Sequence, residues 1–322
     1  MKTTTKKVLS LLLAAATIVA CTLSLSSCGK KKGYTVGICQ LVRHEALDAA
    51  TQGFKDALTE ALGAENVTFI EQNAQNDTIA CSTIVTDFVS KKVDLILANA
   101  TPALQAAFNA TTTIPVLGTS ITEYGVALDI QDFNGTVGGN VSGTSDLAPL
   151  TEQADMILEL FPDAKNVGLI YCSAEPNSEY QVKVIEEYLT DKGLTCTRFS
   201  FSDSNDISAV TTAAAAQSDV IYIPTDNTAA SCSETIGNIV REKKVPVVAG
   251  EQGICAGCGV ATLSISYYDL GVKTGEMAAK ILKGEEKISE MPVEYATATK
   301  MYNPAICEEL GITVPEGYTA IE

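Results

Sequence analysis

Polar side chains that could bind a small ligand follow several short apolar runs of this sequence. The stretch "DVIYIPTDNTAAS" shows the pattern, because an apolar run that is typical of a buried strand ends in a proline and then presents Thr225, Asp226 and Asn227. A carboxylate flanked by two neutral hydrogen-bonding groups could accept hydrogen bonds from a ligand ammonium group. Alternatively, Asp226 could cap a helix that begins near Asn227, as aspartate often does. The residues alone leave both roles open.

A second stretch of this kind is "ANATPALQAAF". We expect Thr101 to be the N-cap of a helix and Pro102 its first helical residue, so that the next backbone amides are free to bind an anion. Thr101 could equally do no more than cap its own helix. An anion site of this kind opposite a carboxylate is the arrangement that a zwitterionic amino acid needs.

The sequence carries no recognisable catalytic or metal motif. Its one histidine, His44, stands between Arg43 and Glu45, and there is no serine elbow, phosphate loop or HExxH motif. His44 could bind a ligand or be solvated. Although Glu251 and Asp226 could meet in a cleft, paired carboxylates for hydrolysis are not evident, so a secreted hydrolase is the less favoured alternative. We predict no enzyme activity, no cofactor and no metal.

Ten cysteines are present, and most lie inside apolar runs, as Cys39, Cys172 and Cys196 do. We expect buried free thiols that pack as small apolar groups. Cys255 and Cys258, in "GICAGCGV", could be a metal half-site, a redox pair or a local disulfide. No second CxxC supports zinc and no helix signal follows to support redox chemistry, so structural packing is the favoured interpretation, with the redox state left open.

The elements that must position these residues alternate along the chain. The apolar runs "TVGICQL", "VTFIEQNA" and "VDLILANA" alternate with helical periodicity at Glu45–Leu62 and Thr78–Ser90. The order then repeats with "NVGLIYC", "LTCTRFSF" and "DVIYIPTD" around Ser178–Thr190 and Ile207–Ala216. This alternation predicts an α/β chain with two Rossmann-like lobes built on parallel sheets. The polar residues after the strands, including Asn99, Thr119 and Ser120, would then line a cleft between the lobes.

Charge and composition narrow the function classes. The chain has 22 Lys+Arg against 39 Asp+Glu and a net charge of −17. This acidity argues against binding to nucleic acid or docking on anionic lipid, since both need cationic surfaces. With 46% hydrophobic residues, the chain can bury a core of about two domains.

The first residues predict export. Lysines precede the apolar run Val8–Leu25, as in a secretory signal, and "LSSC" resembles a bacterial lipobox ending at Cys28. Cys21, in "IVAC", is the alternative lipidation site, and an uncleaved transmembrane anchor is the alternative to cleavage. We favour Cys28 because the polar tether "GKKKG" follows it, which gives a signal peptide at 1–27 and a tether at 28–33.

Four blocks carry a resemblance to a known family: "ICQLVRHEALDAATQGFKDAL", "VDLILANATPALQAA", "IYIPTDNTAAS" and "SISYYDLGVKTGEMAAKILKGE". Together they resemble the ABC-transporter substrate-binding lipoproteins of the tryptophan/tyrosine-binding type, over about Tyr34–Val314. The resemblance implies a type I periplasmic-binding-protein fold, in which two lobes close on a small ligand. Chain crossings between the lobes would fall near "GNVSGTSD", near "SISYYD" and after "MPVEY", and a helix at Leu270–Lys283 would pack on the first lobe.

The resemblance also implies lobe boundaries and ligand contacts. The N-terminal lobe would contain residues 34–144 and 268–291, and the C-terminal lobe residues 145–267 and 292–322. The implied ligand-binding residues are Gln40, His44, Ala100, Thr101, Ser145, Asp146, Asn177, Thr225, Asp226, Asn227 and Tyr267. Relatives often have glutamate-histidine-proline where this chain has "RHE", so Arg43 adds a cation beside the pocket and leaves the charge of the ligand in doubt.

The function that these observations indicate is that of an extracytoplasmic solute-binding lipoprotein of an ABC importer. It would be a monomer anchored by lipid on the outer face of the cytoplasmic membrane, with a permease and an ATPase as partners. Its ligand would be an aromatic or other apolar amino acid. A ligand-sensing module and a receptor for a nucleoside or a sugar are the alternatives.

Overall fold

The computed structural model of the protein describes residues 33–321, which form one compact unit from Tyr34 onward. The predicted signal peptide, Cys21, Cys28 and most of the tether lie outside the described residues. No described helix is both long enough and apolar enough to cross a membrane.

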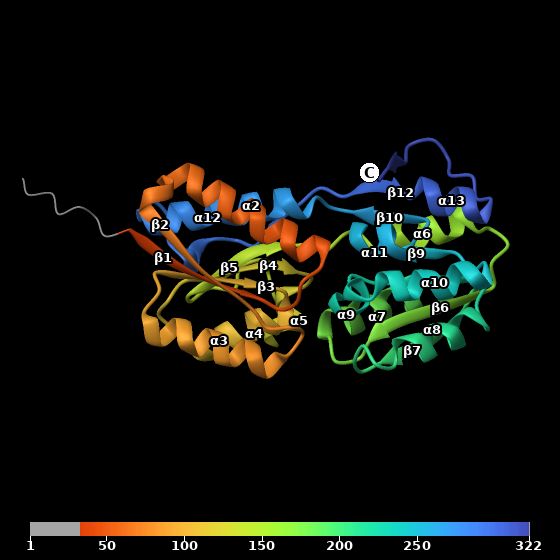
Figure 1. Cartoon of the computed structure of the whole chain (residues 1–322), viewed down its shortest axis with the longest axis horizontal. Coiled ribbons are helices and arrows are strands. Elements are labelled where there is room, and N and C mark those ends of the chain that lie inside the picture. The colour runs from red at the N-terminus through yellow and green to blue at the C-terminus, as the bar shows by residue number, and fades with distance from the viewer. Residues whose placement is uncertain (1–32, 322) are drawn as a thin grey trace, which may run out of the picture. The chain divides into compact units, whose positions relative to one another are not determined.

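The first lobe is built on a six-stranded sheet with the order β11-β5-β4-β3-β1-β2, in which every neighbouring pair is parallel. Its strands are β1 (Tyr34–Gln40), β2 (Val67–Asn73), β3 (Leu95–Asn99), β4 (Val116–Ile121), β5 (Val141–Ser145) and β11 (Glu294–Tyr295). Its helices are α2 (Glu45–Leu62), α3 (Thr78–Lys91), α4 (Thr101–Ala110), α5 (Tyr124–Leu128) and α12 (Tyr267–Lys283), with short 3-10 turns at Ala64–Asn66 and Ile288–Glu290. In Figure 1, α2 and α12 lie on one side of the sheet and α3 and α4 on the other.

The second lobe has a seven-stranded sheet with the order β13-β12-β10-β9-β8-β6-β7. Its strands are β6 (Asn166–Cys172), β7 (Thr195–Phe201), β8 (Val220–Ile223), β9 (Val247–Ala249), β10 (Ala261–Ser264), β12 (Thr299–Tyr302) and β13 (Thr319–Ala320). The helices are α6 (Leu150–Leu160), α7 (Pro176–Asp191), α8 (Ile207–Ala215), α9 (Asn227–Ser231), α10 (Ser233–Lys243), α11 (Gln252–Cys258) and α13 (Pro304–Leu310). The pairing of β10 with β12 is antiparallel and the other pairings are parallel, so the two predicted parallel sheets are present with one antiparallel addition.

The chain crosses between the lobes three times. The crossings follow β5, separate β10 from α12, and separate β11 from β12. Because β11 pairs with β5, Glu294 and Tyr295 belong to the first sheet. The N-terminal lobe therefore extends beyond Met291, where the resemblance implied its end. Ser145 likewise completes β5 in the first sheet.

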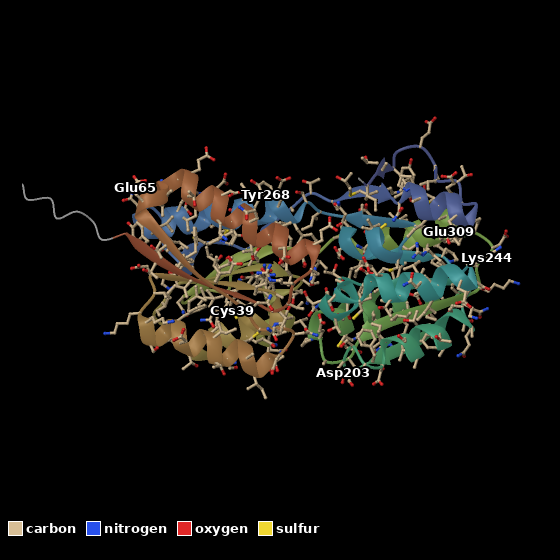
Figure 2. All side chains as sticks on the ribbon, viewed as in Figure 1. Cys39, Glu65, Asp203, Lys244, Tyr268 and Glu309 are labelled. Carbon is tan, nitrogen blue, oxygen red and sulfur yellow. The ribbon has the colours of Figure 1, made fainter. Side chains whose placement is uncertain are left out.

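Close packing of two helices fixes α12 on the first lobe. A Cβ at Gly271 would overlap the carbonyl oxygen of Ala50 on α2, and one at Gly53 would overlap the carbonyl oxygen of Tyr268. Glycine at these two positions therefore lets the backbones of α2 and α12 approach directly. Tyr268 itself, at the surface of α12 (Figure 2), is 42% exposed.

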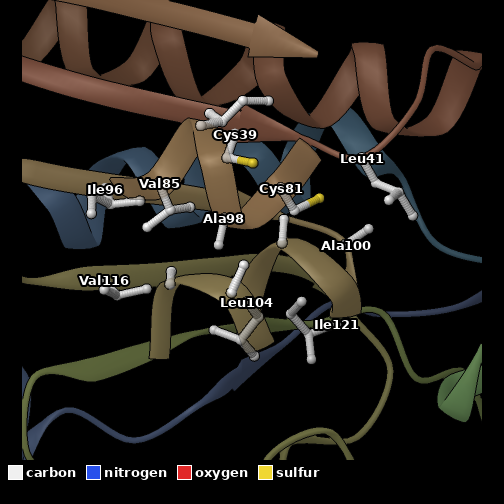
Figure 3. Close-up of a cluster of buried hydrophobic side chains, with 14 of the residues drawn as sticks. Cys39, Leu41, Cys81, Val85, Ile96, Ala98, Ala100, Leu104, Val116 and Ile121 are labelled. Atoms are coloured by element: carbon white, nitrogen blue, oxygen red, sulfur yellow. The ribbon is translucent and has the colours of Figure 1, made fainter. Parts of the chain in front are cut away.

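The cysteines behave as apolar packing groups. Cys39 and Cys81 lie in the core between the first sheet and α3 and α4, among the side chains of Val85, Ile96 and Leu104 (Figure 3). All eight described cysteines are free, and none is exposed. This confirms the prediction of free thiols for the described residues.

The close pair of cysteines lies in a helix, contrary to the absence of a helix signal in the sequence. Both residues are part of α11, where Cys258 Sγ donates to the carbonyl oxygen of Ile254. Burial raises the pKa of both thiols, so neither is a thiolate at neutral pH. The helix was missed because "GICAGC" contains two glycines, which disfavour helix.

Candidate ligand-binding site

Strand ends of both sheets come together at the contact between the lobes. His44 Nε2 lies 3.3 Å from Asn227 Oδ1, and Asn76 Nδ2 donates to Thr228 Oγ1 over 2.9 Å. In each pair the first residue belongs to the first lobe and the second residue to α9 of the second lobe. The carboxyl edges of the two sheets therefore face each other, as the alternation of strands and helices predicts.

The N-terminus of α4 differs from the sequence expectation. Ala100, and not Thr101, is the N-cap residue, while Thr101 and Pro102 are the first two helical residues. Ala100 has φ 87° and ψ 156°, a conformation that residues with a Cβ rarely adopt, and its methyl group is completely buried beside Leu104 and Ile121 (Figure 3). An alanine cannot cap through its side chain, so the first amides of α4 lack a capping group from this residue.

The helices that follow β8 and β9 are capped by carboxylates. Asp226 Oδ1 accepts a hydrogen bond from Ala229 N over 2.8 Å at the start of α9. Glu251 Oε2 accepts from Gly253 N over 2.6 Å at the start of α11. Carboxyl oxygens of the chain itself already accept hydrogen bonds from the amides at these helix ends, which leaves α4 as the better site for the negative group of a ligand.

Both oxygens of Asp226 are engaged within its own lobe. Oδ2 accepts from Cys172 N over 2.6 Å, and Oδ1 caps α9. Burial and, after it, the charge of Glu175 raise the pKa of Asp226 to about 8, while the two backbone donors oppose this shift. The contacts of Asp226 are therefore those of the capping alternative, and its contact with a ligand stays a prediction.

Asp146 is a second buried carboxylate at the facing edges, immediately after β5. Its Oδ2 accepts a hydrogen bond from Tyr267 Oη over 2.9 Å, whereas the buried Oδ1 has no partner among the described residues. Burial raises the pKa of Asp146 to about 6, and the interactions with the Tyr267 and Thr122 side chains limit the shift. Asp146 thus offers one free carboxylate oxygen, which Asp226 does not.

Further buried polar atoms at the strand ends have no hydrogen-bond partner among the described residues. They are His44 Nδ1, Asn73 Nδ2, Asn99 Oδ1, Ser120 Oγ and Asn177 Oδ1. Two more such atoms lie elsewhere, on Thr211 within α8 and on Thr262 within β10. Buried polar atoms normally have partners, so a group of unpaired ones at the facing edges indicates a site for a polar ligand. Ser120, whose φ is 56°, is not among the ligand-binding residues that the family resemblance implies. Its position after an apolar run is the sequence feature that indicates a place in the cleft.

Burial lowers the pKa of His44, and the hydrogen bond with Asn227 and the nearby carboxylates only partly offset this. His44 is therefore a neutral imidazole at neutral pH. A neutral imidazole has one donor and one acceptor nitrogen.

Other residues of the implied set have partners within their own lobe. Gln40 donates to Asp48 Oδ1 over 2.6 Å and accepts from Thr51 Oγ1 over 2.6 Å. The hydroxyl of Ser145 donates to the carbonyl oxygen of Thr122 over 2.8 Å. That of Thr225 donates to the carbonyl oxygen of Gly250 over 3.3 Å. For these residues direct contact with a ligand stays a prediction.

Within residues 33–321, no three histidine, cysteine or carboxylate side chains are arranged to hold a metal ion. Asp226 uses one oxygen to cap α9 and the other to accept from Cys172 N, and both oxygens of Glu251 cap α11. The arrangement is that of a binding site, with a positive helix end, a free carboxylate oxygen and several unpaired neutral groups.

The chain is similar to known proteins over nearly all of its described length. Residues 35–320 match the family described as ABC transporter substrate binding protein. A tyrosine-binding protein of Clostridioides difficile is 35% identical over 84% of this chain and 79% of its own length. Sugar-transport binding proteins at 14–15% identity superpose with TM-scores of 0.60, which shows the type I periplasmic-binding-protein fold.

Two solved structures are similar to this chain over nearly its whole described length. A Streptococcus pneumoniae domain in complex with L-Trp is 33% identical, with a TM-score of 0.85, and covers 90% of this chain and 100% of its own. A ligand-free, open substrate-binding protein from Clostridium difficile is 38% identical, with coverage of 90% and 99%, yet its TM-score is only 0.68.

Proposed function

This chain belongs to the family of ABC transporter substrate-binding proteins, and we propose that its ligand is an aromatic amino acid, which it delivers to an ABC importer. Members of this family bind solutes and do not transform them, which confirms the prediction that the chain is not an enzyme.

The observation that carries the proposal is the presence of two complementary groups at the carboxyl edge of the first sheet, one after β3 and one after β5. The N-terminus of α4 has an alanine in place of a capping side chain, and Asp146 has a buried oxygen without a partner. The helix end suits the carboxylate of an amino acid and Asp146 suits its ammonium group. Relative to the sequence-based hypothesis, the ammonium partner is thus reassigned from Asp226 to Asp146.

The proposal of an aromatic side chain rests on the relatives and on His44. One relative is named for tyrosine binding and another was solved with L-Trp. The phenol of tyrosine and the indole of tryptophan each carry one hydrogen-bond donor. The buried, unpaired Nδ1 of His44 is an acceptor that such a donor would satisfy. The other members of the implied set, including Asn177 and Tyr267, are proposed to complete the pocket.

Calorimetric titration of the purified residues 33–322 with the twenty amino acids tests this proposal. We expect binding of L-tyrosine or L-tryptophan, and at least a hundredfold weaker binding of tyramine, which lacks the carboxylate, and of N-acetyl-tyrosine, which lacks the ammonium charge. Binding of a nucleoside or a sugar, together with no response to any amino acid at millimolar concentration, would refute it.

Lipid anchoring is a separate proposal, supported by the sequence "LSSC" before the tether. Cells expressing the full chain and fed a radiolabelled fatty acid should label the wild type and the Cys21→Ser variant but not Cys28→Ser. Loss of label in Cys21→Ser alone would move the anchor to Cys21.

A further inference from the structure

We propose that Glu175 sets the hydrogen-bond polarity of a latch between the lobes, made of Asn76 with Thr228 and of His44 with Asn227. Glu175 touches neither first-lobe residue. It acts through the two second-lobe residues, whose remaining acceptor atoms face donors of the first lobe. Asn76, Thr228 and Glu175 are not among the implied ligand-binding residues.

Glu175 is a buried carboxylate at the start of α7 that accepts hydrogen bonds from both latch residues of α9. Oε2 accepts from Asn227 N over 3.0 Å and from Asn227 Nδ2 over 2.7 Å. Oε1 accepts from Thr228 N over 2.9 Å and from Thr228 Oγ1 over 2.7 Å. Asn177 Nδ2 adds a longer contact of 3.4 Å to Oε2. Backbone amides can only donate, so both oxygens of Glu175 must act as acceptors.

This arrangement leaves Thr228 and Asn227 with only acceptor atoms to offer to the first lobe. The hydroxyl of Thr228 has one proton, and because that proton goes to Glu175, its oxygen accepts from Asn76 Nδ2 over 2.9 Å. The amide NH₂ of Asn227 points to Glu175, so its Oδ1 faces His44 Nε2 at 3.3 Å. His44 must then carry its proton on Nε2, which leaves Nδ1 as the unpaired acceptor.

The first-lobe side is also held in place. Asn76 has φ 64°, a left-handed conformation that asparagine adopts more readily than most residues. Its backbone N donates to the carbonyl oxygen of Leu41 over 2.8 Å. The latch therefore joins two prearranged partners, which limits the conformational entropy lost when the lobes meet.

Substitutions at Asn76 test the polarity directly. Asn76→Gly removes the donor without strain at positive φ, and we expect the equilibrium constant for lobe closure to fall about two- to tenfold. Asn76→Asp places an acceptor opposite the Thr228 oxygen, whose proton is donated to Glu175. The equilibrium constant for closure should therefore be at least about threefold lower than in Asn76→Gly. Gln75→Asn, at an exposed neighbouring side chain in the same loop, is the matched control and should close like the wild type.

The readout is single-molecule energy transfer between dyes attached through unnatural amino acids at Lys91 on α3 and Asp203 after β7, which are exposed on different lobes (Figure 2 labels Asp203). Closure is measured without ligand and with saturating L-tyrosine. The inference about the latch does not rest on the amino-acid proposal. If L-tyrosine does not bind, closure of the wild type and the Asn76 variants can still be compared without ligand, and only the proposed function is contradicted.

A double-variant experiment isolates the part of Glu175. In Glu175→Gln the side-chain amide has only one acceptor oxygen, so the Thr228 hydroxyl is free to donate to the first lobe instead. The decrease in the equilibrium constant for closure that Asn76→Asp causes should therefore be smaller in this background. An equal penalty in both backgrounds, or an Asn76→Asp protein that closes as well as Asn76→Gly, would overturn the inference. If Glu175→Gln does not fold, as judged by circular dichroism, the comparison of the two Asn76 variants still decides.

Discussion

Replacing Asp146 with asparagine should change ligand affinity and protein stability in opposite directions. The carboxylate is buried and its pKa is raised from 3.8 to about 6. A shift of roughly two units means that the ionised form costs the ligand-free fold about 3 kcal/mol well above pH 6. Because Tyr267 can donate to the amide oxygen as it donates to the carboxylate, Asp146→Asn removes most of that cost. We expect the free energy of unfolding of the ligand-free variant at pH 8 to rise by about 1–3 kcal/mol.

Ligand binding should respond in the opposite sense. A hydrogen bond to an ammonium group contributes about 1.5–3 kcal/mol, so the Kd for L-tyrosine should rise by roughly 10- to 150-fold in Asp146→Asn. In the wild type, protonation of Asp146 competes with the ligand, so affinity should fall about tenfold for each pH unit below about 6. This slope should be reduced in the variant.

Calorimetry between pH 5 and 8 and urea unfolding of the ligand-free protein provide the two measurements. Asp129→Asn, at an exposed aspartate of the same lobe, is the control and should change neither quantity. A Kd for Asp146→Asn within twofold of the wild type at pH 7.5 would refute the assignment. Identical pH slopes for wild type and variant would also refute it.

Three further predictions concern other parts of the chain. Asp226→Ala should lower the free energy of unfolding by about 2–4 kcal/mol in urea unfolding, because it leaves the amides of Cys172 and Ala229 unpaired, while Asp226→Ser, which can still cap, should lose less. A hundredfold loss of affinity with unchanged stability would instead place Asp226 in the ligand site. Gly271→Ala should destabilise by about 1–3 kcal/mol or more through its clash with Ala50, whereas the exposed Glu276→Ala on α12 should be nearly neutral in the same assay. The free energy of unfolding of the ligand-free protein should rise as the pH falls from 8 towards 5. The reason is that three carboxyl groups have higher pKa values in the folded than in the unfolded chain, about 8 for Asp226, 7 for Glu251 and 6 for Asp146. Thermal melts that show the reverse trend would contradict this sign.

The fold could be predicted from the sequence because periodicity and strand order are local signals. The helical period at Glu45–Leu62 coincides with α2, and the one at Thr78–Ser90 ends one residue before α3 does. The helix expected at Leu270–Lys283 begins earlier, at Tyr267, because Ser266 accepts from Asp269 N as its N-cap. The family resemblance is confirmed by the match over residues 35–320.

The roles of individual site residues were harder to predict because they depend on which hydrogen bonds are already made. Thr101 follows a residue that has the φ of a glycine, and no sequence rule assigns that conformation to Ala100. Asp226 and Asp146 both follow a strand, and only the three-dimensional structure shows that one has both oxygens engaged and the other has one free. The sequence does not predict the role of Glu175, because its partners on α9 lie some fifty residues away in the chain.

The return of α12 to the first lobe determines when that lobe can fold during synthesis. Met277, Ala278 and Met291 share a buried cluster with Phe54, Leu97 and Leu117, so the face of the first sheet that α2 covers in part is not fully covered until the ribosome has made the segment after residue 290. A fragment that stops after β5 would expose this apolar face and lack the strand that covers the edge of β5. The second lobe also needs residues from the end of the chain, because β12, α13 and β13 follow α12 and β11 in the sequence. The first lobe, although begun earlier, therefore completes its core only after most of the second lobe has been synthesised.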